Sequence, residues 1–246
     1  MGRSIHLVIP MAGLGSRFSS VGYETPKPFL DIQGLPMIQR VIENNLSPDV
    51  DLVTLVIRAE HLDLCEQIVR LVKGPTVRLV ELEVTSEGPA SSVHQAITGD
   101  SYELLVANSD QLVRDGATPF LEDAFFRRLD GSLMTMEATG TKWSFVRRSR
   151  DGQVIEVREK VEISNEATVG VYWFRTEDLF SELYGEMIMS DDRTNGEFYV
   201  APAYNYLIQR PGTVGAFHVG KFGEDVFGLG TPEDYEWFLA HRPMPL

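Results

Sequence analysis

The chain has 246 residues, of which 43% are hydrophobic and 24% are charged, and its net charge is -14 at pH 7. These values fit one large domain with a full hydrophobic core, and the negative charge argues against nucleic acid or an anionic membrane as a partner. No segment has the pattern of a membrane span or a signal peptide, and the single Cys65 excludes an intrachain disulfide. We therefore expect a cytoplasmic protein.

Strands and helices alternate along the first half of the chain. Apolar runs typical of buried strands are Ile5–Ile9, Leu52–Ile57, Val77–Leu82 and Leu104–Ala107. Amphipathic patterns between them predict helices over Met37–Asn45, Leu62–Val72 and Ser91–Ile97, with Cys65 as a core thiol of the second. This alternation is typical of an α/β fold with a mostly parallel central sheet and helices on both faces.

The second half of the chain is richer in strands. Asp151 and Gly152 are a hairpin signal between strands predicted over Ser144–Arg148 and Val154–Arg158. Further elements are expected at Val169–Phe174 (a strand) and at Asp178–Met187, Phe198–Ile208 and Pro232–His241 (helices). Because no linker or repeat interrupts the chain, we expect this β-rich insertion to belong to the same single unit.

The first predicted strand leads into a glycine loop, Met11–Phe18, which is soon followed by Pro26-Lys27-Pro28. Glycines let backbone N–H groups approach an anion, and Arg17 and Lys27 can neutralise phosphate charges. Counted with Gly13 as the first position, the sixth position is Phe18 and not glycine, which excludes the dinucleotide fingerprint. No Gly-Lys-Ser/Thr closes the loop, which excludes the P-loop. A plain turn explains the glycines, but it leaves the two cations unexplained. We therefore predict a polyphosphate site.

This loop, together with Pro26-Lys27-Pro28, resembles the signature of the sugar-phosphate nucleotidyltransferases and the related small cytidylyltransferases. The resemblance covers nearly the whole chain and implies a three-layer, Rossmann-like (GT-A-like) fold. It divides the single domain into a nucleotide-binding half, residues 1–115, and an acceptor-binding half, residues 116–246. The nucleotide-binding residues that it implies are Met11, Ala12, Gly13, Gly15, Ser16, Arg17, Lys27, Thr85, Glu87, Gly88 and Asn108.

A carboxylate, Asp110, follows the predicted strand Leu104–Ala107. Because ligands of parallel sheets bind at the carboxyl ends of the strands, we expect Asp110 to lie near the glycine loop. A carboxylate beside a triphosphate needs a cation between them, and Mg²⁺ typically binds one or two carboxylates together with phosphate oxygens. Asp110 is thus an expected magnesium ligand, as the resemblance also implies, although an aspartate at this position can equally cap a turn.

The segment Gly228–Asp234 resembles the closing Asp-x-Gly-Thr-Pro segment of the sugar enzymes, with one departure. The family's second metal-binding aspartate falls on Gly228. We expect Asp225 to supply this ligand from a shifted backbone, while Glu224, or Asp110 alone, are the alternatives. The departure also leaves the transfer of sugar specificity open.

The resemblance places the acceptor against the strand-rich half of the chain. Arg158-Glu159-Lys160 is similar to the family's Glu-Lys-Pro segment, whose lysine binds the acceptor phosphate, and Val161 replaces the proline here. An isolated lysine at the end of a strand can also be a solvated charge. The implied acceptor-binding residues are Glu159, Lys160, Gly170, Asn195, Glu197 and Tyr199.

These residues predict a Mg²⁺-dependent nucleotidyltransferase of the pyrophosphorylase type, in which an acceptor phosphate attacks the α-phosphorus of an NTP. The catalytic candidates are Arg17, Lys27 and Asp110, and the attacking phosphate is already anionic, so the reaction needs no general base. Its product would typically be a nucleotide-sugar precursor of capsule or surface polysaccharide. The alternatives are a cytidylyltransferase for a non-sugar phosphate or phosphonate, a glycosyltransferase of related architecture, and a catalytically silent nucleotide-binding regulator. A homodimer is compatible with the sequence, which does not fix the oligomeric state.

Overall fold

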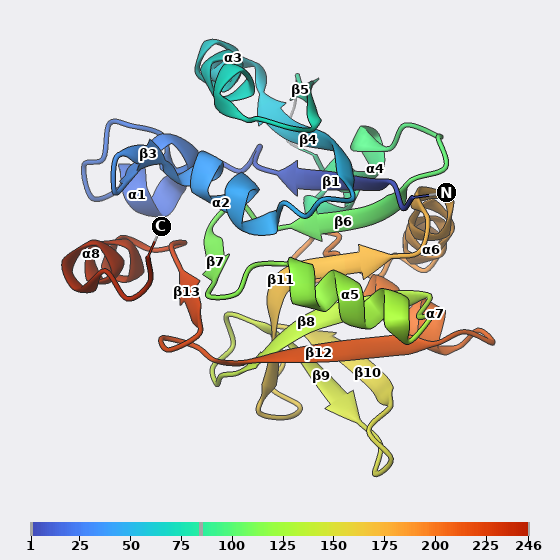
Figure 1. Cartoon of the computed structure of the whole chain (residues 1–246). Coiled ribbons are helices and arrows are strands. Elements are labelled where there is room, and N and C mark those ends of the chain that lie inside the picture. Colours follow the sequence, from blue (N-terminus) through green and yellow to red (C-terminus); the bar gives the residue numbers. More distant parts are fainter. Residues whose placement is uncertain (1, 84–85, 246) are drawn as a thin grey trace.

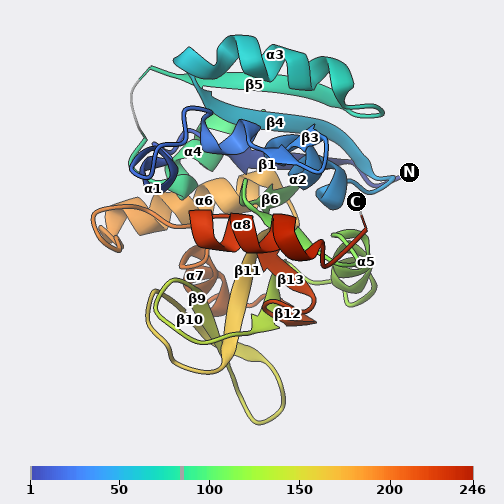
Figure 2. The same cartoon turned by 90° about the vertical axis from the view of Figure 1, so that its left-hand side faces the viewer.

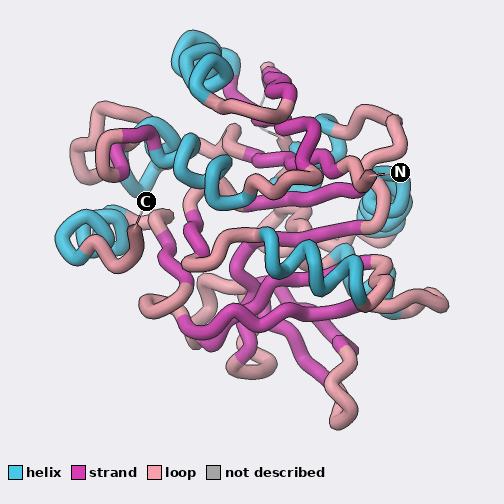
Figure 3. The backbone as a smooth tube through the Cα atoms, in the orientation of Figure 1, coloured by secondary structure: helices cyan, strands magenta, loops and turns pink. Residues whose placement is uncertain are grey.

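The computed structural model describes residues 2–83 and 86–245. A nine-stranded sheet forms the centre of the molecule, and helices cover both of its faces (Figures 1 and 3). The strands are β1 Ile5–Pro10, β2 Asp31–Ile32, β3 Leu35–Pro36, β4 Val50–Arg58, β5 Thr76–Leu82, β6 Glu103–Ala107, β7 Gln111–Val113, β8 Gly131–Glu137, β9 Ser144–Arg148, β10 Val154–Glu159, β11 Glu166–Phe174, β12 Val214–Lys221 and β13 Val226–Gly228. The α-helices are α1 Ser16–Ser19, α2 Met37–Asn45, α3 Leu62–Leu71, α4 Pro89–Ala96, α5 Thr118–Phe126, α6 Glu177–Met189, α7 Ala203–Ile208 and α8 Pro232–His241.

The main path of the sheet runs β10-β9-β11-β6-β1-β4-β5, and β8 pairs with both β11 and β12. The four strands β6, β1, β4 and β5 are parallel, as expected from the alternation in the first half of the chain. The long strand β11 runs antiparallel to β6 and also pairs with β8 and β9. It therefore joins the parallel strands to the hairpin of β9 and β10.

Burial explains why the parallel strands are the elements that are easiest to predict from the sequence. In β1, five of the six residues are buried, because helices pack on both faces of this central strand. The helix α2 buries Met37, Ile38, Val41 and Ile42 on the face that it turns towards the sheet. Cys65 lies in the core as expected, and burial raises the pKa of its thiol to about 12.

Most of the predicted elements are confirmed, and the clearest exception is α7. The prediction begins this helix at Phe198, but the structure begins it at Ala203. The backbone of Phe198 is instead bonded to the start of α4, where it donates to Glu87 O (2.8 Å) and accepts from Ala90 N (3.0 Å). The Phe198 ring is buried and lies 5.8 Å from the ring of Tyr184 on α6, so its aromatic character reflects tertiary packing and not a helical face.

Within residues 2–83 and 86–245, no helix is long and apolar enough to cross a membrane.

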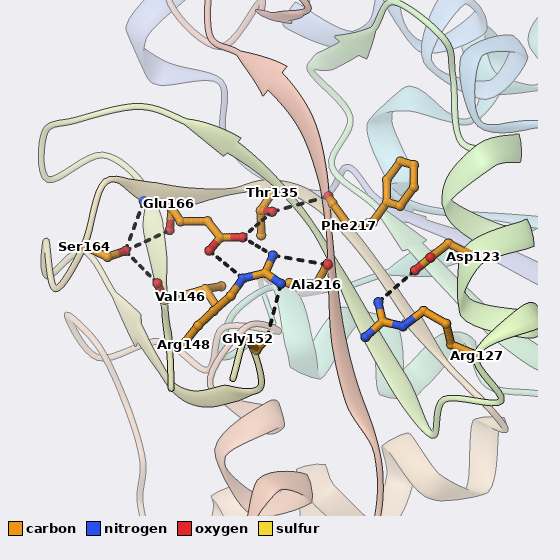
Figure 4. Close-up of polar contacts among 10 residues, drawn as sticks. All are labelled: Asp123, Arg127, Thr135, Val146, Arg148, Gly152, Ser164, Glu166, Ala216 and Phe217. Carbon is orange, nitrogen blue, oxygen red and sulfur yellow. Dashed lines mark hydrogen bonds and ion pairs between the residues drawn. The ribbon is translucent and has the colours of Figure 1, made fainter. Parts of the chain in front are cut away.

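A charged network stabilises the strand-rich side of the sheet (Figure 4). The Arg148 guanidinium on β9 donates from Nε to Glu166 on β11 (2.8 Å) and from Nη2 to the carbonyl of Ala216 on β12 (3.2 Å). The Thr135 hydroxyl on β8 donates to the same carboxylate (2.7 Å). Burial works against the ionised Glu166, but these hydrogen bonds outweigh it and lower the pKa of Glu166. One carboxylate on β11 therefore binds side chains from β8 and β9, and Arg148 extends the network to the backbone of β12.

We expect Glu166→Gln to lower the free energy of unfolding by about 1–3 kcal/mol at pH 7, because Arg148 would lose a charged acceptor. Since the folded-state pKa of Glu166 is lowered, its contribution is complete above the ordinary glutamate pKa and disappears as the pH falls through the folded value. Urea unfolding at pH 7 and at about pH 3 measures both effects. The exposed Glu122→Gln is the control, and an equal loss in the two variants at pH 7 would contradict the prediction.

Candidate active site

A two-part cleft opens at the carboxyl ends of β1 and β6, an edge that faces the viewer in Figure 2 together with α1, α8 and β13. One part, of about 570 Å³, lies against the glycine loop after β1, and we call it the loop compartment. The other, of about 580 Å³, lies against β9, β11 and the residues after β10, and we call it the strand compartment. The residues that line both are Arg17, Pro89, Asn108, Asp110 and Tyr199. A ligand in one compartment can therefore reach a ligand in the other.

The loop compartment contains the predicted polyphosphate loop. The backbone of β1 continues its pairing with β4 through Met11 N, which donates to Val56 O (2.9 Å), and the chain then turns away from the sheet. Lys27 begins a short 3-10 helix, Lys27–Phe29, with a proline on either side, so its backbone is held firmly. The predicted residues that line this compartment are Met11, Ala12, Gly13, Gly15, Arg17, Lys27, Gly88, Asn108, Asp110, Glu197 and Tyr199.

Two predicted nucleotide contacts, Ser16 and Glu87, lie outside the lining of the loop compartment. Ser16 is exposed and is not part of the cleft lining. Glu87 is also outside the lining, and its carboxylate accepts a hydrogen bond from Arg193 Nη2 (3.0 Å) on the surface. Thr85 lies outside the described residues.

Asp110 and Lys27 form an ion pair at the centre of the cleft, with 2.6 Å between Lys27 Nζ and Asp110 Oδ2. The backbone holds Asp110 in place, because its carbonyl accepts from Leu229 N (2.7 Å) next to β13. The pairing of β13 with β7 brings this C-terminal segment to the end of β6. The two side chains are about four-fifths buried, at 18% and 22% exposure, so water screens their attraction only in part.

Asp225, the predicted second magnesium ligand, lies outside both compartments. Its carboxylate accepts a hydrogen bond from Lys221 N (3.1 Å) and lies 3.6 Å from Arg114 Nε. Among the described residues, no group of three or more His, Cys, Asp and Glu side chains could hold a metal. The placement of Asp225 therefore does not support a metal site shared with Asp110.

The strand compartment contains Glu159, Lys160, Gly170, Asn195 and Tyr199, five of the six residues for which the resemblance implies acceptor binding. The sixth, Glu197, lines the loop compartment instead. Lys160 follows β10 with a φ of 56°, a conformation that costs a non-glycine residue roughly 1–3 kcal/mol. Its ammonium lies 4.4 Å from the centre of the Tyr199 ring and donates to the Tyr199 hydroxyl. This hydroxyl in turn donates to Glu197 (2.7 Å). The strained backbone thus presents the lysine to the cleft, and Tyr199 and Glu197 hold it there.

Two further features shape the strand compartment. Burial raises the pKa of Glu159, whose carboxylate accepts a hydrogen bond from the Ser144 hydroxyl. Gly170 has a φ of 91°, and a Cβ on it would lie 2.2 Å from the Asn108 side-chain nitrogen. Only glycine fits there, which explains how β11 can approach the end of β6 so closely.

Several cleft residues were not predicted. They come from the first residue of β7, from the turn before β9 and its first residue, from β11 and from the start of α8. The structure places them in the strand compartment: Gln111, Thr141, Lys142, Trp143, Ser144, Thr168, Tyr172, Thr231 and Asp234. A buried-strand pattern gives no signal for such positions, because each is a single polar or aromatic residue in an ordinary context. Thr231 and Asp234 are partial exceptions, since they belong to the C-terminal segment that carries the resemblance.

Gly230→Ala is a purely steric probe of Asp110. A Cβ at this position would lie 2.8 Å from Asp110 Oδ2, so the carboxylate must move while its charge remains. For the nucleotidyltransferase reaction that the sequence predicts, we expect the variant to lose roughly 10-fold or more in kcat for pyrophosphate release, because small displacements of a positioned group are costly. The measurement is steady-state pyrophosphate release, with thermal unfolding as the check on folding. Unchanged kcat in the folded variant would argue against a role for Asp110 at the reacting atoms.

The model of the MobA-like NTP transferase domain matches residues 7–139, which is more than half of the chain. The chain is 25% identical to the bifunctional protein GlmU of Bacillus subtilis over 231 residues, 88% of this chain and 48% of that protein. It is 32% identical over 91 residues to a 2-aminoethylphosphonate cytidylyltransferase of Lancefieldella rimae, which is 37% of this chain and 36% of that one. The chain thus spans at most about half the length of the curated relatives that it matches.

A solved structure extends the likeness to the whole chain. The nucleoside-diphosphate-sugar pyrophosphorylase of Vibrio cholerae superposes with a TM-score of 0.82 at 25% identity and covers 95% of this chain and 99% of its own. This likeness confirms the α/β fold with a mostly parallel sheet between layers of helices, and it includes the strand-rich half that the domain model leaves out.

Proposed function

The chain belongs to the MobA-like NTP transferase domain family, and from this premise we propose that it transfers a nucleoside monophosphate from an NTP to a small phosphorylated acceptor. One observation carries the proposal: the cleft has two compartments, each with its own cation, and they meet at Arg17 and Asp110. An NTP would occupy the loop compartment, formed mainly by residues 1–115. The acceptor would occupy the strand compartment, formed mainly by residues 116–246, and pyrophosphate would leave.

The chemistry requires charge neutralisation more than proton transfer. An acceptor phosphate is already an anion near pH 7, so it can attack the α-phosphorus without a general base. Arg17 and Lys27 would neutralise charge on the triphosphate and the leaving pyrophosphate, and Lys160 would bind the acceptor phosphate. In a protein with a net charge of -14, such local cations are needed to bring two anions together.

The residues fit a magnesium ion that arrives with the nucleotide. Asp110 is a carboxylate at the junction of the compartments, and no group of three metal-binding side chains surrounds it among the described residues. Mg²⁺ commonly binds in this way, with one protein carboxylate and with phosphate oxygens and water as the other ligands. When bound, the ion would neutralise phosphate charge, and Lys27 would remain available to the triphosphate after leaving Asp110.

The acceptor can also be a non-sugar phosphate or phosphonate, with CTP as the donor. Two observations favour this candidate: Gly228 replaces the aspartate of the sugar enzymes, and a cytidylyltransferase of 2-aminoethylphosphonate is among the relatives. With either acceptor, we propose that the product is an activated precursor for a surface polysaccharide and that this precursor is made in the cytoplasm.

A matrix of CTP, UTP, dTTP, GTP and ATP against sugar 1-phosphates and other small phosphates tests the proposal. With Mg²⁺ present, we expect at least one pair to release pyrophosphate and to form the matching nucleoside diphosphate derivative. A protein that binds a nucleotide but releases pyrophosphate with none of these acceptors would instead be a nucleotide-binding regulator. Formation of free nucleoside diphosphate from a nucleotide-sugar would indicate a glycosyltransferase.

A further inference from the structure

A lysine ammonium lies near two aromatic rings and a carboxylate beside the strand compartment. Lys142, Trp143 and Asp234 line this compartment, and Phe222 lines an adjoining pocket that shares Asp234 with it. Lys142 Nζ is 4.8 Å from the centre of the Trp143 ring and 4.7 Å from that of Phe222. It is also 3.4 Å from Asp234 Oδ2. We call Trp143, Phe222 and Asp234 the ammonium cage. Its members come from the turn before β9, the segment after β12 and the first turn of α8, so the fold as a whole assembles it.

The cage has the chemistry of an ammonium-binding site. The face of an aromatic ring attracts a cation within about 6 Å of its centre, and both rings meet this condition. The ring centres are 5.1 Å apart with their planes at 60°, which leaves a corner open to a cation. Asp234 supplies the balancing negative charge. A ligand group that suits two ring faces and a carboxylate must be a cation with apolar surroundings, and an ammonium group has this character.

Lys142 can be displaced from the cage. Its side chain is 47% exposed, and it belongs to a turn between β8 and β9. An exposed ion pair of this kind contributes little, because solvent screens the charges and the long side chain loses entropy. The lysine therefore occupies the cage as a tethered and exchangeable ligand.

The departure at Gly228 helps to form the cage. A Cβ at this position would lie 3.2 Å from the Phe222 ring and 3.9 Å from Asp234 Oδ2. An aspartate side chain would extend further into the same space, against both members of the cage. Glycine leaves that space to the ring of Phe222.

The geometry points to an acceptor that carries an ammonium group at its end remote from the phosphate, and this inference rests on the proposed function. Lys160 would bind the phosphate or phosphonate, while the ammonium would replace that of Lys142 in the cage. Lys142, Trp143, Asp234 and Lys160 all line the same 580 Å³ compartment, so the cage and the lysine proposed for the phosphate face one cavity. Asp110 lies at its boundary with the loop compartment, where the transfer would take place.

Matched pairs of acceptors test the inference by turnover. One pair is ethanolamine phosphate and 2-hydroxyethyl phosphate, and the other is choline phosphate and 3,3-dimethylbutyl phosphate, which keeps the shape without the charge. With the best NTP and Mg²⁺, we expect kcat/KM for pyrophosphate release to favour the ammonium member of at least one pair roughly 10-fold or more. Equal use of charged and neutral members in both pairs would overturn the inference.

Variants of the cage test it by binding, measured by calorimetry with ethanolamine phosphate and choline phosphate. We expect Asp234→Asn and Phe222→Leu to weaken the binding of the ammonium ligand roughly 10-fold and to leave the neutral partner unchanged. Glu233→Gln removes the same charge from the neighbouring exposed position, and it should have no effect. Lys142→Ala vacates the cage and should strengthen ammonium binding several-fold. If Lys142→Ala instead weakens the binding of every phosphate, Lys142 is an anion ligand and the inference fails.

The failure of this inference and that of the proposed function can be told apart. If the protein releases pyrophosphate with sugar phosphates but shows no preference for an ammonium group in turnover or binding, the ammonium inference fails and the proposed transferase function stands. If binding is selective for ammonium and depends on Asp234, but no NTP and acceptor release pyrophosphate, the proposed transferase function fails and the ammonium-binding site stands.

Discussion

Lys27→Ala is expected to lower kcat/KM for pyrophosphate release roughly 10²–10³-fold, the loss typical of removing one charge-stabilising donor from a transition state. Lys27 lies in the loop compartment with its backbone held between two prolines, and its ammonium is 2.6 Å from Asp110. In the proposed reaction it neutralises the triphosphate, whose negative charge grows on the leaving pyrophosphate. The measurement is steady-state pyrophosphate release at saturating acceptor.

A purely structural role for Lys27 makes a different prediction. If the lysine only balances the charge of Asp110, removing both side chains should restore activity and stability together. If it acts on the substrate, the double variant Lys27→Ala/Asp110→Ala should be at least as inactive as either single variant, although its thermal unfolding recovers. Lys73→Ala removes an exposed lysine remote from the cleft and serves as the control. Full activity of Lys27→Ala would remove the lysine from the triphosphate site.

The sequence predicts those parts of the fold in which one physical effect dominates. The strands β1 and β4 are buried on both faces, so they read as continuous apolar runs. The strands β8 and β12 contain glycine and polar residues at positions packed by neighbours from distant parts of the chain, and they were not predicted. Gly131 of β8 shows why: a Cβ there would lie 2.8 Å from the Leu207 side chain, a contact that only the tertiary structure creates.

The candidate site follows the same division. Arg17 and Lys27 belong to a local pattern in which spacing alone suggests an anion, and Asp110 follows a readable strand. That these three residues lie close together could be predicted from one rule, namely that the carboxyl ends of parallel strands lie at the same edge of the sheet. The ammonium cage has no such local pattern, because Trp143, Phe222 and Asp234 meet only through β9, β12 and α8. Asp225 is the opposite case, since its closeness to Gly228 in the sequence does not place it among the residues that line the cleft.

Lys160→Ala is expected to raise the KM for the acceptor roughly 10-fold or more, with a much smaller effect on the KM for the NTP, since a charged hydrogen-bonding group is worth about 1.5–3 kcal/mol. The structure separates the two substrates, because Lys160 lines the strand compartment but not the loop compartment. Arg158→Ala removes a cation from the same hairpin two residues away, where the side chain is 59% exposed and paired with Glu156. This control should change neither KM.

The backbone of Lys160 provides a second and independent readout. Because its φ is 56°, glycine should be accommodated with less strain than alanine, so Lys160→Gly should be more stable to thermal unfolding than Lys160→Ala. Both variants lack the ammonium and should show the same rise in the acceptor KM. Lys160→Arg should recover part of the acceptor affinity, since it restores the charge. If acceptor KM followed stability across the three variants instead of following the charge, Lys160 would be a structural residue, and the acceptor phosphate would have to bind elsewhere in the strand compartment.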